Sequence, residues 1–246
     1  MDIKGSIALV TGANRGIGRA FVEVLLAQDA AKVYAAARKL ETLDEIVALD
    51  KDRVVPLQID VTKDAEIRAA ADSAGDVNLL LNNAGTAQFQ SLLGADSLDA
   101  ARLDMETNYF GALAVVRAFA PILKANGGGA IVTLGSIASH VNFPMLGSYS
   151  ASKAAVHSLI QGVRAELRAQ GTHVVGVYPG PVDTDMAEEI TMDKVPPSQI
   201  AEAALQAVAD GTEDVFPDPV SVELYGGFRQ DPKALERQVA EMGGEA

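Results

Sequence analysis

A tyrosine and a lysine, Tyr149 and Lys153, stand four positions apart in the sequence. Residues at this spacing share one face of a helix, so the phenol and the ammonium group can point into one site. A free tyrosine has a pKa of ~10, and a nearby cation favours its phenolate. Tyr149 could then donate a proton to a carbonyl oxygen or accept one from an alcohol. The spacing alone is weak evidence, because such pairs are common in helices.

A glycine-rich segment near the start of the chain has the composition of a dinucleotide-binding turn. Its spacing, Gly-x-x-x-Gly-x-Gly, places Gly12, Gly16 and Gly18 between an apolar run and a helical pattern. Glycine permits a tight turn and the close approach of a pyrophosphate, and the helix N-terminus supplies free N–H groups. The alternative is a glycine-rich turn without a ligand. Its position in the first strand–helix unit favours the cofactor site.

The elements that must position these residues alternate along the chain. Short apolar runs predict strands that are too hydrophobic to face water, which is typical of a parallel sheet covered by helices on both faces. The predicted strands are Ile7–Val10, Val33–Ala37, Val54–Ile59, Val77–Leu81, Ala130–Leu134 and His173–Val177. The predicted helices are Gly16–Gln28, Leu40–Leu49, Ala65–Asp72, Leu98–Lys124 with a break or bend near Pro121, Ser150–Ala169, Ser198–Asp210 with Ser198 as N-cap, and Pro232–Glu241. We expect one doubly wound α/β domain of the Rossmann type over residues 1–246.

These motifs resemble the short-chain dehydrogenase/reductase family, in its shorter form. The resemblance covers about residues 5–185 and includes Asn82-Asn83-Ala84-Gly85 after the fourth strand, which matches a family motif without change. It implies reversible hydride transfer between a nicotinamide cofactor and a carbonyl compound or secondary alcohol. The alternatives are a non-catalytic NADP-sensing or regulatory protein on the same fold and a sugar-nucleotide epimerase. Retention of Tyr149 and Lys153 argues against the former, and the short chain and the glycine spacing argue against the latter.

The resemblance implies a catalytic set of Asn108, Ser136, Tyr149 and Lys153. Ser136, at the end of the fifth strand, would polarise the substrate oxygen, and Tyr149 would serve as general acid or base. Lys153 would also hydrogen-bond the nicotinamide ribose. Asn108, in the long helix, would hold a local backbone irregularity and a water that connects to the lysine.

The end of the second strand bears on the choice of cofactor. NAD sites commonly carry Asp or Glu there, but this chain has Arg38 and Lys39 and no carboxylate until Glu41. Arg38 could grip a 2′-phosphate with two donors, and Arg15 could reach it from the other side. The sequence therefore predicts NADP(H). The alternative is that Arg38 and Lys39 are solvated residues at the start of a helix.

Other predicted cofactor contacts also come from the resemblance. Asp60 and the backbone N–H of Val61 would hold the adenine, although Asp60 could instead cap the helix that follows. Val182 and Thr184 would bind the nicotinamide carboxamide. The complete predicted cofactor set is Gly12, Asn14, Arg15, Gly16, Ile17, Gly18, Arg38, Asp60, Val61, Asn83, Ala84, Gly85, Tyr149, Lys153, Pro179, Gly180, Val182 and Thr184.

Composition excludes several classes of function. The chain has 246 residues, a net charge of −13 and no cysteine, so there is no disulfide framework and no cysteine-ligated metal. We predict no metal site. An acidic chain is a poor nucleic-acid binder, and no apolar run approaches the ~18 residues of a membrane helix. The absence of cysteine favours a reducing cytoplasm. The family resemblance implies a homodimer that pairs through its two long helices, whereas a tetramer is left open because the region after 213 departs from the family pattern.

The negative charge is concentrated at the end of the sequence, where residues 181–246 carry a net −11. This part includes a predicted substrate lid loop, 181–197, and a predicted acidic tail, 228–246. The expected pocket walls, Ala84–Gln90, Ile137–Leu146 and the lid, are mostly apolar. An uncharged ketone, aldehyde or alcohol is therefore the predicted substrate. His140 lies in one wall segment, either as a solvated loop residue or as a substrate contact.

Overall fold

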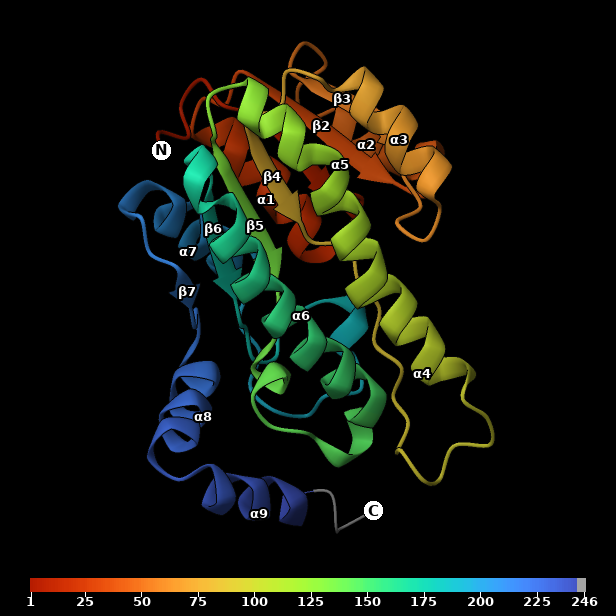
Figure 1. The fold of residues 1–246 in the computed structure, drawn as a ribbon. Helices are drawn as coiled ribbons and strands as arrows, with labels where there is room; N and C mark the ends of the chain where they lie inside the picture. Colours follow the sequence, from red (N-terminus) through yellow and green to blue (C-terminus); the bar gives the residue numbers. More distant parts are fainter. Residues whose placement is uncertain (243–246) are drawn as a thin grey trace.

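The apolar runs form one parallel sheet in the computed structural model, which describes residues 1–242 (Figure 1). Over that range the sheet has seven strands in the order β3-β2-β1-β4-β5-β6-β7, which confirms the doubly wound fold. The winding direction reverses between β1 and β4, where folds of this kind bind ligands at the carboxyl ends of the strands. The strands are β1 (Ile7–Thr11), β2 (Lys32–Ala37), β3 (Val54–Gln58), β4 (Leu79–Asn82), β5 (Ala130–Leu134), β6 (His173–Val177) and β7 (Asp214–Val215).

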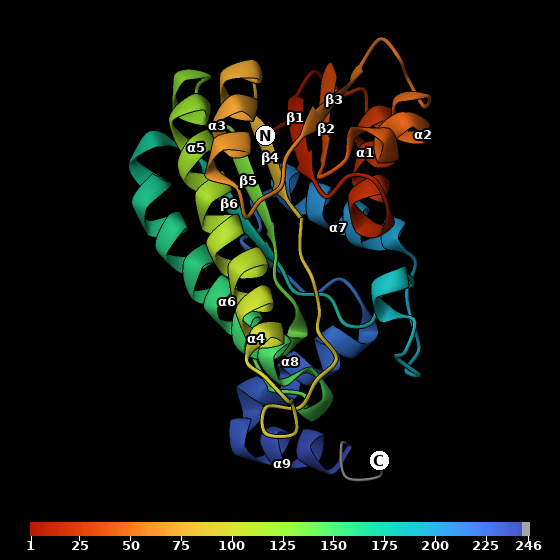
Figure 2. The same cartoon turned by 90° about the vertical axis from the view of Figure 1, so that its right-hand side faces the viewer.

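Helices cover both faces of the sheet, as the side view shows (Figure 2). Alternate residues of a strand point to opposite faces, so β1 contributes to two cores. Ala8 and Val10 pack in the core with Phe21, whereas Leu9 packs in the core with Phe119. On one face lie α1 (Gly16–Ala27), α2 (Asp44–Val47) and α7 (Pro197–Asp210), and on the other α3 (Asp64–Ser73), α5 (Ala112–Ala125) and α6 (Gly147–Leu167).

The helix predicted for Leu98–Lys124 forms, but its interior contains a segment that is not α-helical. The chain forms α4 (Asp99–Asp104), then a π-helical segment, Met105–Gly111, and then α5. The irregularity therefore lies around Asn108, and α5 continues through Pro121. Helix α7 begins at Pro197, one residue before the predicted cap, because the fixed φ of proline suits the first turn of a helix.

The C-terminal region contains more structure than the sequence patterns predict. Helix α8 (Pro219–Gln230) had no predicted counterpart, since Pro219 and a pair of glycines resemble a loop. Helix α9 (Pro232–Met242) follows, and Leu235 and Val239 on it pack with Ile137 near the carboxyl end of β5. The predicted tail is thus a docked helix as far as it is described, and its residues 243–246 lie outside the described residues. Figure 1 shows α8 and α9 beyond the carboxyl ends of the strands.

His140 occupies an aromatic cluster rather than solvent or the predicted pocket wall. Its ring centroid lies 4.7 to 5.6 Å from five other rings, those of His157, Tyr178, Phe216, Tyr225 and Phe228. Its Nδ1 is buried and has no hydrogen-bond partner among the described residues. Burial, aided by the neighbouring His157, lowers the pKa of His140 to about 4.

This buried histidine predicts a loss of stability in acid. In the unfolded chain a histidine has a pKa of ~6.5, so between pH 6.5 and 4 the unfolded state binds the proton that the folded state refuses. The free energy of unfolding should therefore fall as the pH drops through this window. We expect His140→Phe to reduce the difference in urea stability between pH 8 and pH 5. His173→Phe, at the start of β6, is the control. If His140→Phe loses as much stability as the wild type between pH 8 and pH 5, the assignment is wrong.

Candidate active site

The glycine-rich turn between β1 and α1 packs so closely against its neighbours that it has no room for larger side chains. Gly12 and Gly16 have φ angles of 67° and 53°, which disfavour other residues. A Cβ on Gly18 would lie 2.0 Å from the Gly12 carbonyl oxygen, and one on Gly12 would lie 3.1 Å from Cα of Ala84. Arg15, at the N-cap position of α1, makes no side-chain capping bond. The glycines therefore let this turn pack closely against neighbouring segments, and the N-terminus of α1 that follows it is the predicted site of a dinucleotide pyrophosphate.

A hydroxyl joins this turn to the end of β4. Thr11 Oγ1 accepts hydrogen bonds from the backbone N–H groups of Asn83 and Ala84, both at 3.0 Å. The side chain of Asn83 donates to the Thr11 carbonyl oxygen at 2.8 Å. The sequence did not indicate Thr11, because its partners lie about 70 positions away. These bonds fix the two loops side by side at the point where the winding reverses.

The two arginines predicted to bind the cofactor phosphate are Arg15, in the glycine turn, and Arg38, after β2. Arg38 follows β2 and is exposed, as is Lys39. Arg15 is paired with Asp185 from the predicted lid, at 2.6 Å between Nη1 and Oδ2, and both side chains are mainly exposed. Arg15 is thus within reach of the lid, and a bound phosphate would compete with Asp185 for it.

Asp60 forms a turn of its own after β3. Its Oδ1 accepts from the backbone N–H and the hydroxyl of Thr62, at 3.0 and 2.7 Å, and α3 begins only at Asp64 with Lys63 at its N-cap position. The structure therefore does not show the helix-capping alternative. Burial opposes ionisation of Asp60, but the bonds from Thr62 and the charges of Lys63 and Arg38 outweigh it and lower its pKa. Val61 beside it is buried.

Asn108 lies in the π-helical segment and is buried. Its side-chain amide pairs with the backbone of Thr86: Oδ1 accepts from the Thr86 N–H at 2.8 Å, and Nδ2 donates to the Thr86 carbonyl at 2.9 Å. Nδ2 also donates to the hydroxyl of Ser152, at 2.9 Å. A Cβ on Gly85 would lie 3.0 Å from the Asn108 Oδ1 and 3.7 Å from the Lys153 Nζ. Asn108 thus anchors the loop after β4 close to the predicted lysine.

Tyr149 and Lys153 stand together on α6, which begins at Gly147, three residues before the predicted start. The Lys153 Nζ lies 5.7 Å from the centre of the Tyr149 ring and donates to the Leu134 carbonyl at 2.7 Å. Ser136 lies beyond the end of β5, where its hydroxyl accepts from the Ala138 N–H at 3.1 Å. Ser136 also acts on Tyr149, since a hydrogen bond between their hydroxyls would lower the pKa of the phenol. The four predicted catalytic residues therefore come together at the carboxyl edge of the sheet.

The surroundings set the protonation of this pair. Burial raises the pKa of Tyr149 to about 12, although the hydrogen bond with Ser136 opposes the rise. Burial also lowers the pKa of Lys153 to about 8, against the pull of the Asp104 carboxylate. At neutral pH the phenol is protonated and the amine is mostly charged. This is the state needed to give a proton to a carbonyl oxygen.

A buried carboxylate fixes the segment Pro179–Thr184, in which the predicted nicotinamide contacts lie. The Asp218 Oδ2 accepts from the Gly180 N–H at 2.8 Å, and its Oδ1 accepts from the Ser221 N–H at 2.9 Å. A Cβ on Gly16 would lie 3.1 Å from Cγ2 of Thr184. This segment therefore passes next to the glycine turn. Asp218 was not identified from the sequence because it lies 38 positions after its partner.

The predicted lid and pocket walls make contacts that the sequence did not indicate. Within the lid, residues 181–197, Val182 and Val195 form a parallel bridge. Val141 and Phe143 of one predicted wall pack in a cluster with Leu224 of α8, a helix that was not predicted.

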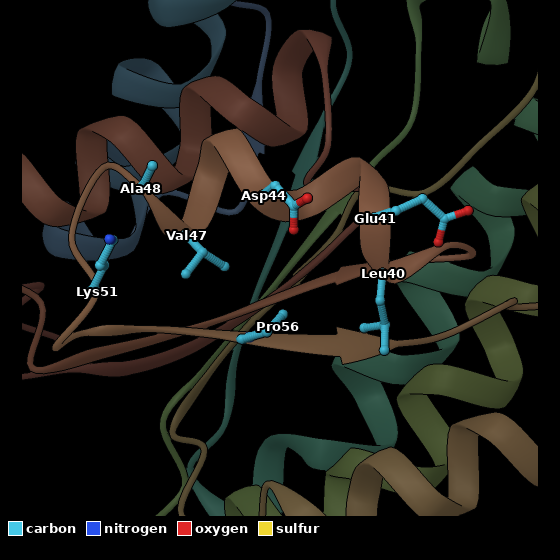
Figure 3. A pocket seen from close by; sticks show the side chains of 7 residues that line it. All are labelled: Leu40, Glu41, Asp44, Val47, Ala48, Lys51 and Pro56. Atoms are coloured by element: carbon cyan, nitrogen blue, oxygen red, sulfur yellow. The ribbon is translucent and has the colours of Figure 1, made fainter.

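A surface hollow lies away from this constellation, between α2 and β3 (Figure 3). It has a volume of about 370 Å³ and contains none of the predicted cofactor or catalytic residues. It is lined by Leu40, Glu41, Asp44, Val47, Ala48, Lys51 and Pro56. Among residues 1–242, no group of three acidic or histidine side chains could hold a metal, and no helix is long and apolar enough to span a membrane.

Comparisons with known proteins agree with this geometry. Residues 6–195 match the family described as short chain dehydrogenase. The chain is 35% identical over 214 residues to short-chain dehydrogenase PC-15 of Penicillium crustosum, which covers 83% of this chain and 76% of that protein.

Two solved structures show the same fold over nearly the whole chain. A short chain dehydrogenase from Burkholderia cenocepacia in complex with NADP is 41% identical, has a TM-score of 0.93, and covers 97% of this chain and 99% of its own. A short chain dehydrogenase/reductase from Burkholderia phymatum in complex with NAD is 26% identical, has a TM-score of 0.84, and covers 97% and 96%.

Proposed function

Because the chain belongs to the short-chain dehydrogenase family, a family of nicotinamide-dependent oxidoreductases, we propose that it transfers a hydride between NADP(H) and an uncharged ketone or aldehyde, or the corresponding alcohol. One observation carries the proposal. Tyr149 and Lys153 lie together on α6, and the Lys153 Nζ lies 3.7 Å from a Cβ built on Gly85, in the loop that Thr11 joins to the glycine turn. This proximity supports a site in which hydrogen-bond donors for a carbonyl oxygen lie next to a bound cofactor.

The side chains supply the proton chemistry. Bound NADPH supplies the hydride. The hydroxyls of Ser136 and Tyr149 orient the carbonyl group by donating to its oxygen, and the Tyr149 proton passes to that oxygen as negative charge develops on it. Lys153, held by the Leu134 carbonyl, stabilises the phenolate that remains. In the oxidation of an alcohol the same groups act in reverse.

The preference for NADP(H) is supported by charge. Arg38 and Lys39 follow β2, and the chain has no carboxylate after this strand until Glu41, so the position at which NAD sites carry Asp or Glu is basic. The relative from Burkholderia cenocepacia, at 41% identity, is described in complex with NADP, whereas the relative described with NAD is 26% identical. Both considerations favour NADP(H).

The preference for an uncharged substrate rests on the acidic lid and C-terminal part, which carry most of the net charge. We expect that, in a panel of ketones and aldehydes of matched size, uncharged members have kcat/KM values about tenfold or more above their carboxylate analogues. NADPH consumption at 340 nm measures both. The difference in kcat/KM between the uncharged compounds and their carboxylate analogues should decrease in high salt, which screens the charge of the lid. Equal activity on the carboxylates would contradict the substrate class without affecting the reaction class.

A cytoplasmic homodimer is also part of the proposal. Leu103 and Phe110, seven positions apart on the α4 and π-helical segment, are 46% and 50% exposed. This apolar stripe supports pairing of the long helices between two copies of the chain. Mass photometry would distinguish a dimer from a monomer or a tetramer.

A further inference from the structure

The carboxyl group of Asp104 is fully buried and has no role in the proposed chemistry so far. Asp104 is the last residue of α4 and precedes Asn108 by about one helical turn. Its Oδ2 accepts a hydrogen bond of 2.6 Å from the hydroxyl of Ser148, and its Oδ1 has no partner among the described residues. A buried carboxyl group is costly unless it is paired, so its position next to the site requires a reason.

The groups that face Asp104 favour its charged form. Ser148 lies in the first turn of α6, where the helix dipole attracts an anion. A distance of 2.6 Å falls in the range of a hydroxyl bonded to a carboxylate. Burial raises the pKa of Asp104, and the bond from Ser148 and the charge of Lys153 oppose this rise without cancelling it. Lys153 and Tyr149 of α6 are the titratable groups that interact with it.

Lys153 makes no ion pair within 4 Å among the described residues. Its hydrogen bond is to the neutral Leu134 carbonyl, and among the described residues Asp104 is the group whose charge acts on it. Tyr149 lies directly after Ser148, so the bond from Ser148 to Asp104 also fixes the turn that carries the phenol. One carboxylate therefore contacts the start of α6 and balances the charge further along it.

We propose that Asp104 is a positioning residue for the Tyr149–Lys153 pair. Through Ser148 it fixes the first turn of α6, and its negative charge keeps Lys153 protonated and Tyr149 neutral, which sets the site for carbonyl reduction. The inference rests on the proposed function for the direction of the reaction. The charge relation between Asp104 and Lys153 stands independently of any substrate.

The charge relation has a definite sign. A carboxylate stabilises a nearby ammonium group and destabilises a nearby phenolate, so Asp104 raises the pKa of both Lys153 and Tyr149. Burial pulls the pKa of Lys153 down to about 8 in spite of this. Without the carboxylate, the pKa of Lys153 would fall further toward neutral pH.

The test is the titration of Lys153 by nuclear magnetic resonance of ¹³Cε-labelled lysine, assigned by the signal that disappears in Lys153→Arg. We expect a wild-type midpoint near pH 8, and a midpoint about one pH unit lower in Asp104→Asn, which keeps the shape of the side chain and can still accept from Ser148. Ser148→Ala keeps the charge and should give a clearly smaller shift. An unchanged midpoint in Asp104→Asn would overturn the proposal.

A kinetic readout separates positioning from a merely structural role. In Asp104→Asn, the pH at which reduction declines on the alkaline side should move down by a similar amount, whereas simple loss of structure would lower kcat equally at every pH. A wild-type enzyme without reductase activity would refute the proposed function, but the Lys153 midpoint would still test Asp104.

A second substitution that stabilises α6 guards against misfolding of the Asp104→Asn variant. A Cβ on Gly162, inside α6, would meet nothing within 4 Å, so Gly162→Ala should strengthen this helix and can carry Asp104→Asn. The wild-type protein alone also tests the charge relation. A Lys153 midpoint below pH 7 would show that Asp104 does not keep Lys153 charged at neutral pH and would overturn the proposal.

Discussion

Replacing Tyr149 by phenylalanine is expected to lower kcat for carbonyl reduction by about 10³-fold, within the range for loss of a positioned general acid. The ring still fills its half-buried site on α6, so the fold and the binding of NADPH should be retained. Only the hydroxyl that is expected to supply the proton is lost. Steady-state kinetics with a ketone found in the substrate panel, together with fluorescence titration of NADPH, measure the two effects separately.

A second tyrosine provides a control for the loss of a phenol. Tyr34, in β2, donates to Asp76 at 2.9 Å, far along the sheet from the catalytic edge. Tyr34→Phe should affect stability and leave kcat near the wild-type value. If Tyr149→Phe keeps kcat within a few-fold of the wild type, another group is the acid.

Replacing Arg38 by aspartate is expected to reverse the cofactor preference. The variant loses a guanidinium that can bond a 2′-phosphate with two charge-assisted hydrogen bonds, and it gains a repulsive carboxylate. We expect kcat/KM for NADPH to fall about 100-fold or more, from the loss of interactions of about 1.5 to 3 kcal/mol each. NADH should be retained or improved, because a carboxylate at this position can accept from the ribose hydroxyls. The ratio of kcat/KM for the two cofactors is the measurement.

The adjacent lysine is the matched control for this change. Lys39→Asp alters the net charge equally, one residue away and on an equally exposed side chain. If the effect is specific to Arg38, Lys39→Asp should change the cofactor ratio much less. Equal effects of both variants would mean that the general field, rather than a contact to the phosphate, selects the cofactor. A wild-type preference for NADH would refute the prediction outright.

Arg15 is a less decisive site for the same experiment. In the structure it bonds to Asp185 of the lid, and the pair is exposed. Exposed ion pairs contribute little, about 0 to 1 kcal/mol, so a 2′-phosphate could displace Asp185 at small cost. Loss of Arg15 would therefore combine effects on the lid with effects on the cofactor, which is why Arg38 gives the clearer test.

Local patterns were sufficient to predict strands β1 to β6 and their order along the chain, but not the short edge strand β7. Strand β1 and strand β5 are apolar because helices cover both faces, and this requirement is written directly into their residues. The glycine turn was predictable for a related reason, since Gly18 lies where any Cβ would collide with the Gly12 carbonyl. The catalytic roles of the assembled side chains stay predictions until the variants are measured.

Contacts between distant segments were not predictable from such patterns. Asp104 and Ser148 are 44 positions apart, and Gly180 and Asp218 are 38 apart. A single Asp in an acidic chain carries no local sign that it will be buried. Its partner is decided only when two helices or loops pack together.

His140 shows most clearly which properties follow from the sequence and which depend on the tertiary structure. Its position four residues after Ser136 suggested a place near the site, but Tyr225 and Phe228 on an unpredicted helix enclose it in the aromatic cluster. The sequence by itself determined the fold class, the family and the residue types at the site, because these follow from local periodicity, glycine geometry and helical spacing. Only the tertiary structure decided which carboxylates support the site and which side chains turn away from it, because burial and charge balance depend on neighbours that the chain brings together on folding.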